Sequence, residues 1–209
     1  KTKLVFLCNP NNPTGTLVPK EKLNDFCSTV SKDTVLFSDE AYYEFLDAPV
    51  DLLPLIRSED KPNLLVMRTF SKIYGLAGLR IGYGFGHPDF ISALEKVRQP
   101  FNTNSIAQAG AMAALDDGDH LLDTRKVNAE GLQYFESFCE DNGYEFVPSA
   151  ANFVLIRVGD GQDIFEELQK QGVITRPMGG YGLPEWLRLS IGTADENKRA
   201  AEALKAALT

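Results

Sequence analysis

The sequence predicts an α/β fold, in which a mostly parallel sheet covered by helices is followed by a small α+β domain. Two observations support this prediction. Short apolar segments alternate with helical segments over the first half of the chain, and this alternation is typical of a parallel sheet with helical crossovers. Polar residues also follow three of the apolar segments directly. They would therefore lie at the edge of the sheet where open α/β proteins bind ligands.

The elements of the first half follow in order from these patterns. Residues 4–8 form a short apolar strand, and the Pro and Gly residues that come next, in 9–15, fix a turn. Pro19 suits the first turn of a helix, because proline lacks only an amide that would be unpaired there. We expect strand 4–8, helix 19–31, strand 35–38, a polar insert, strand 64–69, strand 81–85 and helix 88–98.

The second half begins after a break at residues 100–104. Ser105 is expected to cap an Ala-rich helix over 106–115, and the polar turn 116–119 is the predicted domain boundary. This boundary gives domains 1–117 and 118–209. Gly143 suits the residue just past the end of a long helix. We expect helix 120–142, strands 144–147 and 152–158, helix 163–171, strands 173–176 and 187–191, and helix 195–208.

Composition and charge exclude several classes of partner. The formal net charge of −8 argues against nucleic acid or an anionic membrane as a partner. No apolar run approaches the roughly 20 residues of a membrane span. Cys8, Cys27 and Cys139 lack metal-ligand spacing and suggest reduced thiols in the cytoplasm. The two histidines are far apart in the sequence, so we expect no metal site.

The most informative residue is Lys72, which follows the apolar segment 64–69. A lysine surrounded by apolar residues is poorly solvated as an ammonium, and its neutral amine can attack a carbonyl. Arg80 follows after a loop punctuated by glycine, and a guanidinium suits phosphate oxygens. An aldehyde that carries a phosphate is pyridoxal phosphate, so the pair suggests a Schiff-base enzyme. A surface lysine and arginine on a turn is the alternative.

Two further segments support this interpretation. Asn12 lies in the turn after the first strand, and its amide can face a ligand at the strand ends because a residue before proline is biased to an extended backbone. Asp39 ends the second strand. An aspartate there can hold a pyridine nitrogen protonated, which makes the ring an electron sink.

Several motifs in this order resemble a known family. Residues 9–15 read Asn-Pro-Asn-Asn-Pro-Thr-Gly, residues 38–42 read Ser-Asp-Glu-Ala-Tyr, and Thr69-Phe-Ser-Lys72 is followed by Arg80. Together they resemble the class I/II, fold-type I pyridoxal-phosphate aminotransferases. Residues 172–178, 181–184 and 187–193 add a resemblance to the histidinol-phosphate aminotransferase branch. The resemblance covers essentially the whole chain and implies part of a three-layer large domain, a small C-terminal domain and a homodimer.

The family's enzymes carry further residues before the Asn-Pro-Asn-Asn-Pro-Thr-Gly turn, so the chain resembles their C-terminal portion. The preceding part would supply the helix start that holds the cofactor phosphate and the aromatic side chain that stacks on the cofactor ring. We therefore expect the chain to hold only some of the residues that bind the cofactor.

The resemblance implies a role for each cofactor-binding residue. Lys72 would form the Schiff base and move a proton, and Asp39 would pair with the pyridinium nitrogen. Tyr42 and Asn12 would bond the 3′-oxygen of the cofactor. The cofactor phosphate would be bound by Ser71, Thr69 and Arg80. For Tyr42 the alternative is a packing role with Tyr43 as its rival, and for Asp39, Asn12 and Ser71 the alternative is capping or turn formation.

Two arginines in the second half are candidates for substrate binding. Arg188 lies in an alternating strand whose other face is apolar, and the resemblance implies that it binds the α-carboxylate of an amino-acid substrate. Arg176 is a second candidate, because a pocket that accepts both a carboxylate and a phosphate gains from two guanidinium groups. A solvated arginine on the strand face is the alternative for Arg188.

The implied reaction is transamination between histidinol phosphate, or an aromatic amino acid, and 2-oxoglutarate. Two other interpretations stay open. One is a decarboxylase on the same scaffold, similar to the threonine-phosphate decarboxylases. The other is a truncated, non-catalytic module that only binds a partner. Fold-level resemblance does not decide among them.

Overall fold

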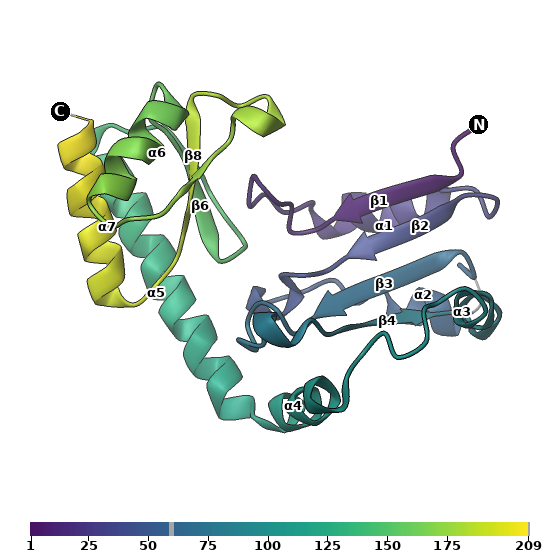
Figure 1. The fold of residues 1–209 in the computed structure, drawn as a ribbon. Helices are drawn as coiled ribbons and strands as arrows, with labels where there is room; N and C mark the ends of the chain where they lie inside the picture. Colours follow the sequence, from purple (N-terminus) through teal and green to yellow (C-terminus); the bar gives the residue numbers. More distant parts are fainter. Residues whose placement is uncertain (59–60, 209) are drawn as a thin grey trace. The chain divides into compact units, whose positions relative to one another are not determined.

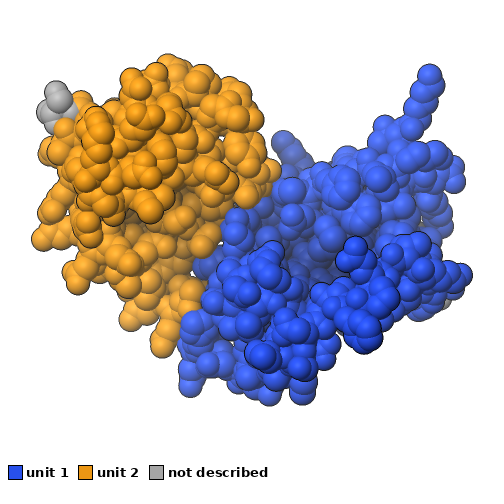
Figure 2. Space-filling model, in the orientation of Figure 1, with its two compact units in different colours: residues 1–10, 17–122 blue, residues 11–16, 123–209 orange. Residues whose placement is uncertain are grey.

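The computed structural model describes residues 1–58 and 61–208. The chain divides into two compact units, shown in different colours in Figure 2. Unit 1 comprises Lys1–Pro10 and Leu17–Leu122, and unit 2 comprises Asn11–Thr16 and Asp123–Thr209. Among the described residues, no helix combines the length and the apolar character that crossing a membrane requires.

Unit 1 is built on a sheet in the strand order β1-β2-β3-β4. The strands are β1 Leu4–Cys8, β2 Val35–Asp39, β3 Leu64–Thr69 and β4 Gly82–Gly86 (Figure 1). β2 pairs parallel with both β1 and β3, while β4 pairs antiparallel with β3. The predicted mostly parallel sheet is therefore confirmed, with one antiparallel strand at its edge.

Helices cover the sheet of unit 1. They are α1 Lys20–Thr29, α2 Leu53–Arg57, α3 Pro88–Glu95 and α4 Ser105–Asp116, with short 3₁₀ turns η1 Tyr43–Phe45 and η2 Ala77–Leu79. Leu23 and Cys27 of α1 pack with Leu36 of β2 and Val66 of β3, and all four side chains are buried. This apolar layer fixes α1 against the sheet, so the loops that follow the strands have a rigid base.

Two details of unit 1 differ from the sequence prediction. Helix α2 lies in the segment predicted only as a polar insert, because Ile56 and the preceding Leu52 are buried in the core of the unit. Asn104, and not Ser105, caps α4: its side chain accepts a hydrogen bond from the amide of Ala107 at 2.8 Å. Ser105 is instead the first residue of that helix.

Unit 2 is an α+β unit with an antiparallel sheet in the order β5-β6-β8-β7. Phe135, Leu168 and Leu204, one from each helix, are fully buried in its core. The elements of this half are α5 Gly118–Asn142, β5 Phe146–Val147, β6 Phe153–Arg157, α6 Gly161–Lys170, β7 Arg176–Pro177, η3 Gly179–Tyr181, β8 Trp186–Ser190 and α7 Ala194–Ala207 (Figure 1).

The compact units differ in extent from the domains 1–117 and 118–209. The predicted polar turn around Gly118 is short, since α4 ends at Asp116 and α5 already begins at Gly118. The contacts change from unit 1 to unit 2 only after Leu122, within α5. The turn 11–16 belongs to unit 2, where the amide of Ala150 donates to the carbonyl of Gly15 at 2.8 Å.

The strand predicted over 173–176 is displaced toward the C-terminus. Val173 lies in the C-terminal cap of α6, because its amide donates to the carbonyl of Leu168 at 2.9 Å just after Gly172, whose φ is 75°. The observed strand is β7, Arg176–Pro177, and Arg176 lies opposite Arg188 of β8. The capping turn that follows α6 therefore occupies the first residues of the predicted strand.

Candidate functional site

The carboxyl ends of three strands in unit 1 meet at one edge of the sheet. The register pairs Cys8 of β1 with Asp39 of β2, and Asp39 with Met67 of β3. Oδ1 of Asp39 accepts a hydrogen bond from the amide of Ala41 at 3.1 Å, and Oδ2 lies 3.8 Å from the Cys8 thiol, which donates to it. Burial, followed by the nearby Asp39 carboxylate, raises the pKa of Cys8. Asp39 therefore does fix the local turn, and it presents a second oxygen beside a protonated thiol.

Lys72 and Tyr42 lie next to each other. Lys72 follows β3, and its Nζ is 5.2 Å from the centre of the Tyr42 ring. Within the described part of the chain, this ammonium forms no hydrogen bond or ion pair with the protein. Tyr42 is buried, whereas the rival Tyr43 stacks under Arg68. Of the two tyrosines, Tyr42 is therefore the one beside the lysine.

Thr69, Ser71 and Arg80 form a cluster of hydrogen-bond donors near Lys72. Nη1 of Arg80 donates to Ser71 Oγ at 3.3 Å and to the carbonyl of Ala77 at 2.8 Å. The amide of Ser71 donates to Thr69 Oγ1 at 3.0 Å. Arg80 adopts a left-handed backbone with φ of 54°, which is uncommon for a residue with a side chain and occurs often at functional sites. Two hydroxyls and one guanidinium make a set suited to a phosphate group.

Asn12 and Arg188 come together in unit 2. Nη1 of Arg188 donates to Asn12 Oδ1 at 2.5 Å, although 176 positions separate the two residues in the sequence. The Arg188 guanidinium lies 4.9 Å from the centre of the buried Phe153 ring. Its Nε is buried and has no hydrogen-bond partner in the described protein. A buried donor without a partner is costly, so an anionic ligand would complete this group.

Arg176 and Arg188 occupy facing positions on neighbouring strands. They are register partners of the antiparallel pair β7 and β8, so both side chains leave the same face of the sheet. Arg176 is exposed and Arg188 is partly buried. Like charges opposite each other on a sheet are unfavourable, and an anion between them removes that repulsion. The structure thus brings the two predicted anion-binding arginines onto one surface.

Two charged residues that the sequence prediction did not single out are sequence neighbours of the predicted site residues of unit 1. Glu40 follows Asp39, and Arg68 precedes Thr69. They form a buried ion pair, with Arg68 Nε and Nη2 each 2.9 Å from Glu40 Oε2. Burial raises the pKa of Glu40 to about 7, although the Arg68 guanidinium acts in the opposite direction. An arginine inside the otherwise apolar strand 64–69 was the signal that could have revealed this pair.

The sequence and the fold of the chain can be compared with those of known proteins. A family model described as aminotransferase class I and II matches residues 1–204. The chain belongs to this family.

Relatives of known name support a narrower similarity within the family. A histidinol-phosphate aminotransferase from Akkermansia muciniphila is 46% identical over 207 residues, which are 99% of this chain and 56% of the relative. Histidinol-phosphate aminotransferase 1 from Cupriavidus pinatubonensis is 50% identical over 212 residues, with the same two coverages, 99% and 56%. The chain therefore spans just over half the length of the curated relatives it matches.

Solved structures of the family have the same fold. The histidinol-phosphate aminotransferase from Sinorhizobium meliloti, in complex with pyridoxal-5′-phosphate, matches with a TM-score of 0.90 and 36% identity, over 98% of this chain and 57% of that one. The L-threonine-O-3-phosphate decarboxylase from Porphyromonas gingivalis matches with a TM-score of 0.84 and 25% identity, over 98% of this chain and 64% of that one. The fold is thus shared by enzymes with two different reactions.

Proposed function

We propose that this chain is part of a pyridoxal-phosphate-dependent aminotransferase that transfers an amino group from histidinol phosphate to 2-oxoglutarate, with aromatic amino acids as alternative donors. The observation that supports it most is the arrangement of five residues in unit 1. Lys72 lies beside Tyr42, and hydrogen bonds join Thr69, Ser71 and Arg80. Family membership and the names of relatives at 46% and 50% identity point in the same direction.

The residues of unit 1 fit pyridoxal phosphate. When bound, that cofactor supplies an aldehyde that condenses with an amine and a ring that withdraws electrons from the bond to be broken. Arg80, Ser71 and Thr69 would hold its phosphate, because they offer a guanidinium and two hydroxyls in mutual contact. The Asp39 carboxylate would bind the ring N–H, and one of its oxygens is already fixed by the Ala41 amide. The Tyr42 hydroxyl would bind the 3′-oxygen. Asn12 belongs to unit 2, and its role toward the same oxygen rests on the family resemblance alone.

Lys72 is the proposed general base. Its amine would carry the proton from the α-carbon of the amino donor to the C4′ carbon of the cofactor, and in the opposite direction for the acceptor. The amine has no hydrogen bond or ion pair with other described residues, so no protein group competes for it. The Tyr42 ring at 5.2 Å limits where the ammonium can lie. Its position on a loop that follows β3 ties the base to a rigid strand.

Arg188 and Arg176 are the proposed substrate-binding residues. The unpaired Nε of Arg188 would donate to the α-carboxylate of glutamate. In histidinol phosphate a CH₂–phosphate replaces that carboxylate and carries up to two negative charges near pH 7. Arg176, directly across the β7–β8 pair, would supply the second guanidinium. This explains how one surface could accept two anions of different charge.

The cofactor role can be tested by borohydride reduction after pyridoxal phosphate is added to the chain. A single pyridoxyl label on Lys72, located by peptide mass spectrometry, is expected. The Lys72→Arg variant is the matched control and should give no label in that peptide. Labelling scattered over surface lysines, with Lys72 unlabelled, would contradict the assignment.

The substrate role can be tested with Arg176→Ala. The variant should lose activity with histidinol phosphate more than with glutamate, because only the phosphate needs the second guanidinium. Arg157→Ala is a suitable control, since Arg157 is an arginine of the same sheet that pairs with Glu145 and Glu185 at an exposed position. Unchanged kinetics for both substrates in Arg176→Ala would exclude this role.

A phosphoamino-acid decarboxylase is the second candidate function. The Porphyromonas gingivalis structure, an L-threonine-O-3-phosphate decarboxylase, supports it, and that name also implies a phosphorylated substrate. Release of CO₂ and formation of a keto acid distinguish the two reactions in one assay. CO₂ release without keto acid from a phosphorylated amino acid would favour the decarboxylase. If neither product forms, the remaining interpretation is a module that only binds a partner.

The assembly and location of the protein are part of the same proposal. Class I/II aminotransferases are expected to act as homodimers in the cytoplasm, and the three free thiols Cys8, Cys27 and Cys139 agree with a reducing compartment. Sedimentation analysis of the purified protein would show a dimer if this is correct, and a monomer at all concentrations would contradict it.

A further inference from the structure

Among the described residues of unit 1, Glu40 and Arg68 form the most buried ion pair. Glu40 is only 3% exposed, and both its carboxylate oxygens have partners. Oε2 accepts from Nε of Arg68 at 2.9 Å and lies 2.9 Å from Nη2 of the same guanidinium, and Oε1 accepts from Ser38 Oγ at 3.4 Å. The Arg68 guanidinium also stacks on Tyr43, with 3.4 Å between Cζ and the ring centre. The geometry of both side chains is therefore fixed from several directions.

The pair lies on the face of the sheet opposite to Asp39 and Thr69. Side chains alternate along a strand, so Ser38 and Glu40 point to one face while Asp39 points to the other. The same alternation separates Arg68 from Thr69. The β2–β3 pairing ends at Asp39 and Met67, and the Glu40 amide extends it by donating to the Met67 carbonyl at 2.9 Å. The ion pair thus joins the two strands at the point where the site residues begin.

The contacts of Arg68 extend toward the loop that carries Lys72. Tyr83 is the register partner of Arg68 in the β3–β4 pair. Its ring packs on Phe70, which packs on Tyr74, with 5.3 and 5.0 Å between the ring centres, so these side chains form a network of contacts. Burial raises the pKa of Tyr74 to about 12, so its hydroxyl stays protonated in this network. Tyr74 lies two positions after Lys72 in the sequence. The network therefore connects the ion pair to the loop of the proposed general base.

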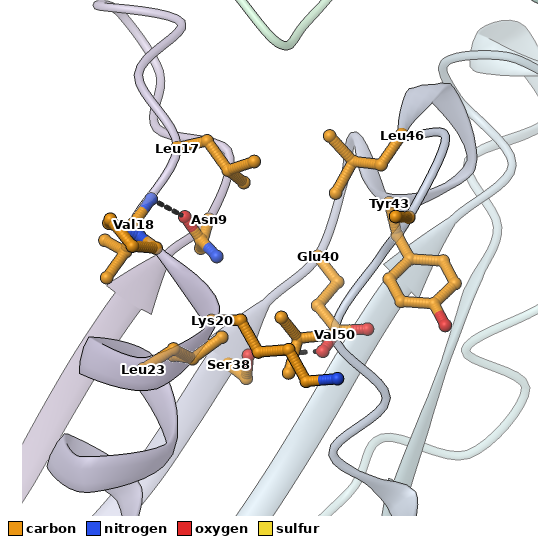
Figure 3. Close-up of a pocket in the computed structure, with 12 residues that line it drawn as sticks. Asn9, Leu17, Val18, Lys20, Leu23, Ser38, Glu40, Tyr43, Leu46 and Val50 are labelled. Atoms are coloured by element: carbon orange, nitrogen blue, oxygen red, sulfur yellow. Dashed lines mark hydrogen bonds between the residues drawn. The ribbon is translucent and has the colours of Figure 1, made fainter.

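A small cavity borders Glu40, and it is too small to bind a substrate. Figure 3 shows Glu40 and Ser38 with Lys20, Tyr43 and Val50 around them. The cavity measures about 80 Å³, whereas small-molecule sites measure roughly 300 Å³ or more. The cavity therefore does not explain the buried carboxylate of Glu40, whose main partner is the Arg68 guanidinium.

Stability alone does not require an ion pair at this position. Removing two charges from water costs several kcal/mol per ion, and apolar side chains of similar volume often replace such a pair without loss of stability. Apolar side chains cannot, however, fix direction as a charge-assisted hydrogen bond between a guanidinium and a carboxylate oxygen does. The retained charges therefore point to a geometric role.

Building on the proposed function, we propose that Glu40 and Arg68 are positioning residues of the cofactor site. The ion pair holds the ends of β2 and β3 in one relative register, and thereby sets where Asp39, Tyr42 and the Lys72 loop present their polar groups. Neither residue would contact the cofactor, because their side chains leave the face of the sheet opposite to Asp39 and Thr69. Glu40 and Arg68 act through the backbone, because Asp39 precedes Glu40 and Thr69 follows Arg68 in the sequence. Arg68 also acts through Tyr43, on which it stacks and which follows Tyr42.

The test replaces the pair by apolar residues of similar length, in the double variant Glu40→Met/Arg68→Met. Its free energy of unfolding should stay close to that of the parent, while the rate of pyridoxyl labelling at Lys72 should fall roughly tenfold or more, because small displacements of reacting groups have large effects on rate. The matched control is Glu145→Met/Arg157→Met, which removes an exposed ion pair of unit 2 and should leave the labelling rate unchanged.

A second variant covers the case in which the double variant does not fold. Arg68→Lys keeps the positive charge but loses the two-donor guanidinium, so it should fold and label Lys72 at a rate between those of the parent and the double variant. Labelling at the parent rate in either folded variant would overturn the proposal.

Amide hydrogen exchange, measured without cofactor, separates this proposal from the proposed function. Exchange at residues 70–75 should be roughly tenfold faster in the double variant than in the parent, because the loop loses its link to the ion pair. Unchanged exchange there would overturn the positioning role. If the parent chain is not labelled at Lys72, that result counts against the proposed function alone, and the exchange measurement still decides the positioning role.

Discussion

Replacing Gly15 by alanine should destabilise unit 2 through a backbone effect and a steric effect that can be measured separately. Gly15 has φ of +75°, and its carbonyl accepts from the Ala150 amide at 2.8 Å. A Cβ at this position would overlap with Oγ of Ser149, and it would lie 2.7 Å from the Cβ and 3.2 Å from the Cα of the same residue. Rotation of the hydroxyl can relieve only the first contact, so the backbone must move.

The size of the effect follows from these two terms. The left-handed backbone costs a residue with a side chain about 1 to 2 kcal/mol. Overpacking against a side chain that cannot move away costs about 1 to 3 kcal/mol. Gly15→Ala should therefore lower the free energy of unfolding by about 2 to 5 kcal/mol. It should also disturb the Asn12–Arg188 contact, because Asn12 lies in the same turn.

Urea unfolding followed by tryptophan fluorescence measures this effect, since the single tryptophan, Trp186, lies in β8 of unit 2. The matched control is Gly143→Ala, because Gly143 has φ of +71° and nothing lies within 4 Å of an added Cβ. This control should show only the backbone term of about 1 to 2 kcal/mol. Equal losses in the two variants would refute the steric argument.

Three further predictions follow from the burial and contacts of single side chains. Since the pKa of Glu40 is raised from 4.5 to about 7, the folded chain binds the proton more tightly than the unfolded chain does. The stability that Glu40 contributes is present below pH 4.5 and lost as the pH rises through 7. The difference in unfolding free energy between the parent and Glu40→Gln should therefore shift by about 3 kcal/mol across this range, and a constant difference in urea titrations would contradict it. Phe135→Ala removes a fully buried ring and should cost about 3 to 5 kcal/mol by the same assay, whereas the exposed Tyr134→Ala should cost far less. Asn197→Ala removes both hydrogen bonds to the backbone of Gly192, at 2.8 and 3.1 Å, and should lower the melting temperature; an unchanged value would show that water replaces both bonds.

The sequence was sufficient for the sheet of unit 1 and for the residues at its edge. β3 was predicted with its observed bounds, because a short apolar run that ends in polar residues is typical of a buried strand. The same local signal selected Asp39, Lys72 and Arg80. Their chemistry is visible in the residue types, since an amine, a carboxylate and a guanidinium follow neighbouring strands. Their roles toward the cofactor stay predictions.

The sequence was not sufficient where a side chain or a segment depends on distant parts of the chain. Helix α2 was missed because its few helical residues give no clear period, and only the burial of Ile56 shows why it forms. The strand predicted over 173–176 was displaced because Gly172 and Val173 form the C-terminal cap of α6. Local propensity is weak in both places, so tertiary contacts decide the conformation.

The sequence by itself determined which chemical groups this chain carries and the order in which strands present them, because residue type and hydrophobic period are local properties. Only the tertiary structure decided which groups meet. Asn12 contacts Arg188 because the turn 11–16 packs in unit 2, and Arg176 faces Arg188 because β7 pairs with β8 in that register. Glu40 and Arg68 meet because two parallel strands bring residues 28 positions apart to one side of a sheet. Pairings of this kind depend on strand register and packing, which no local pattern specifies.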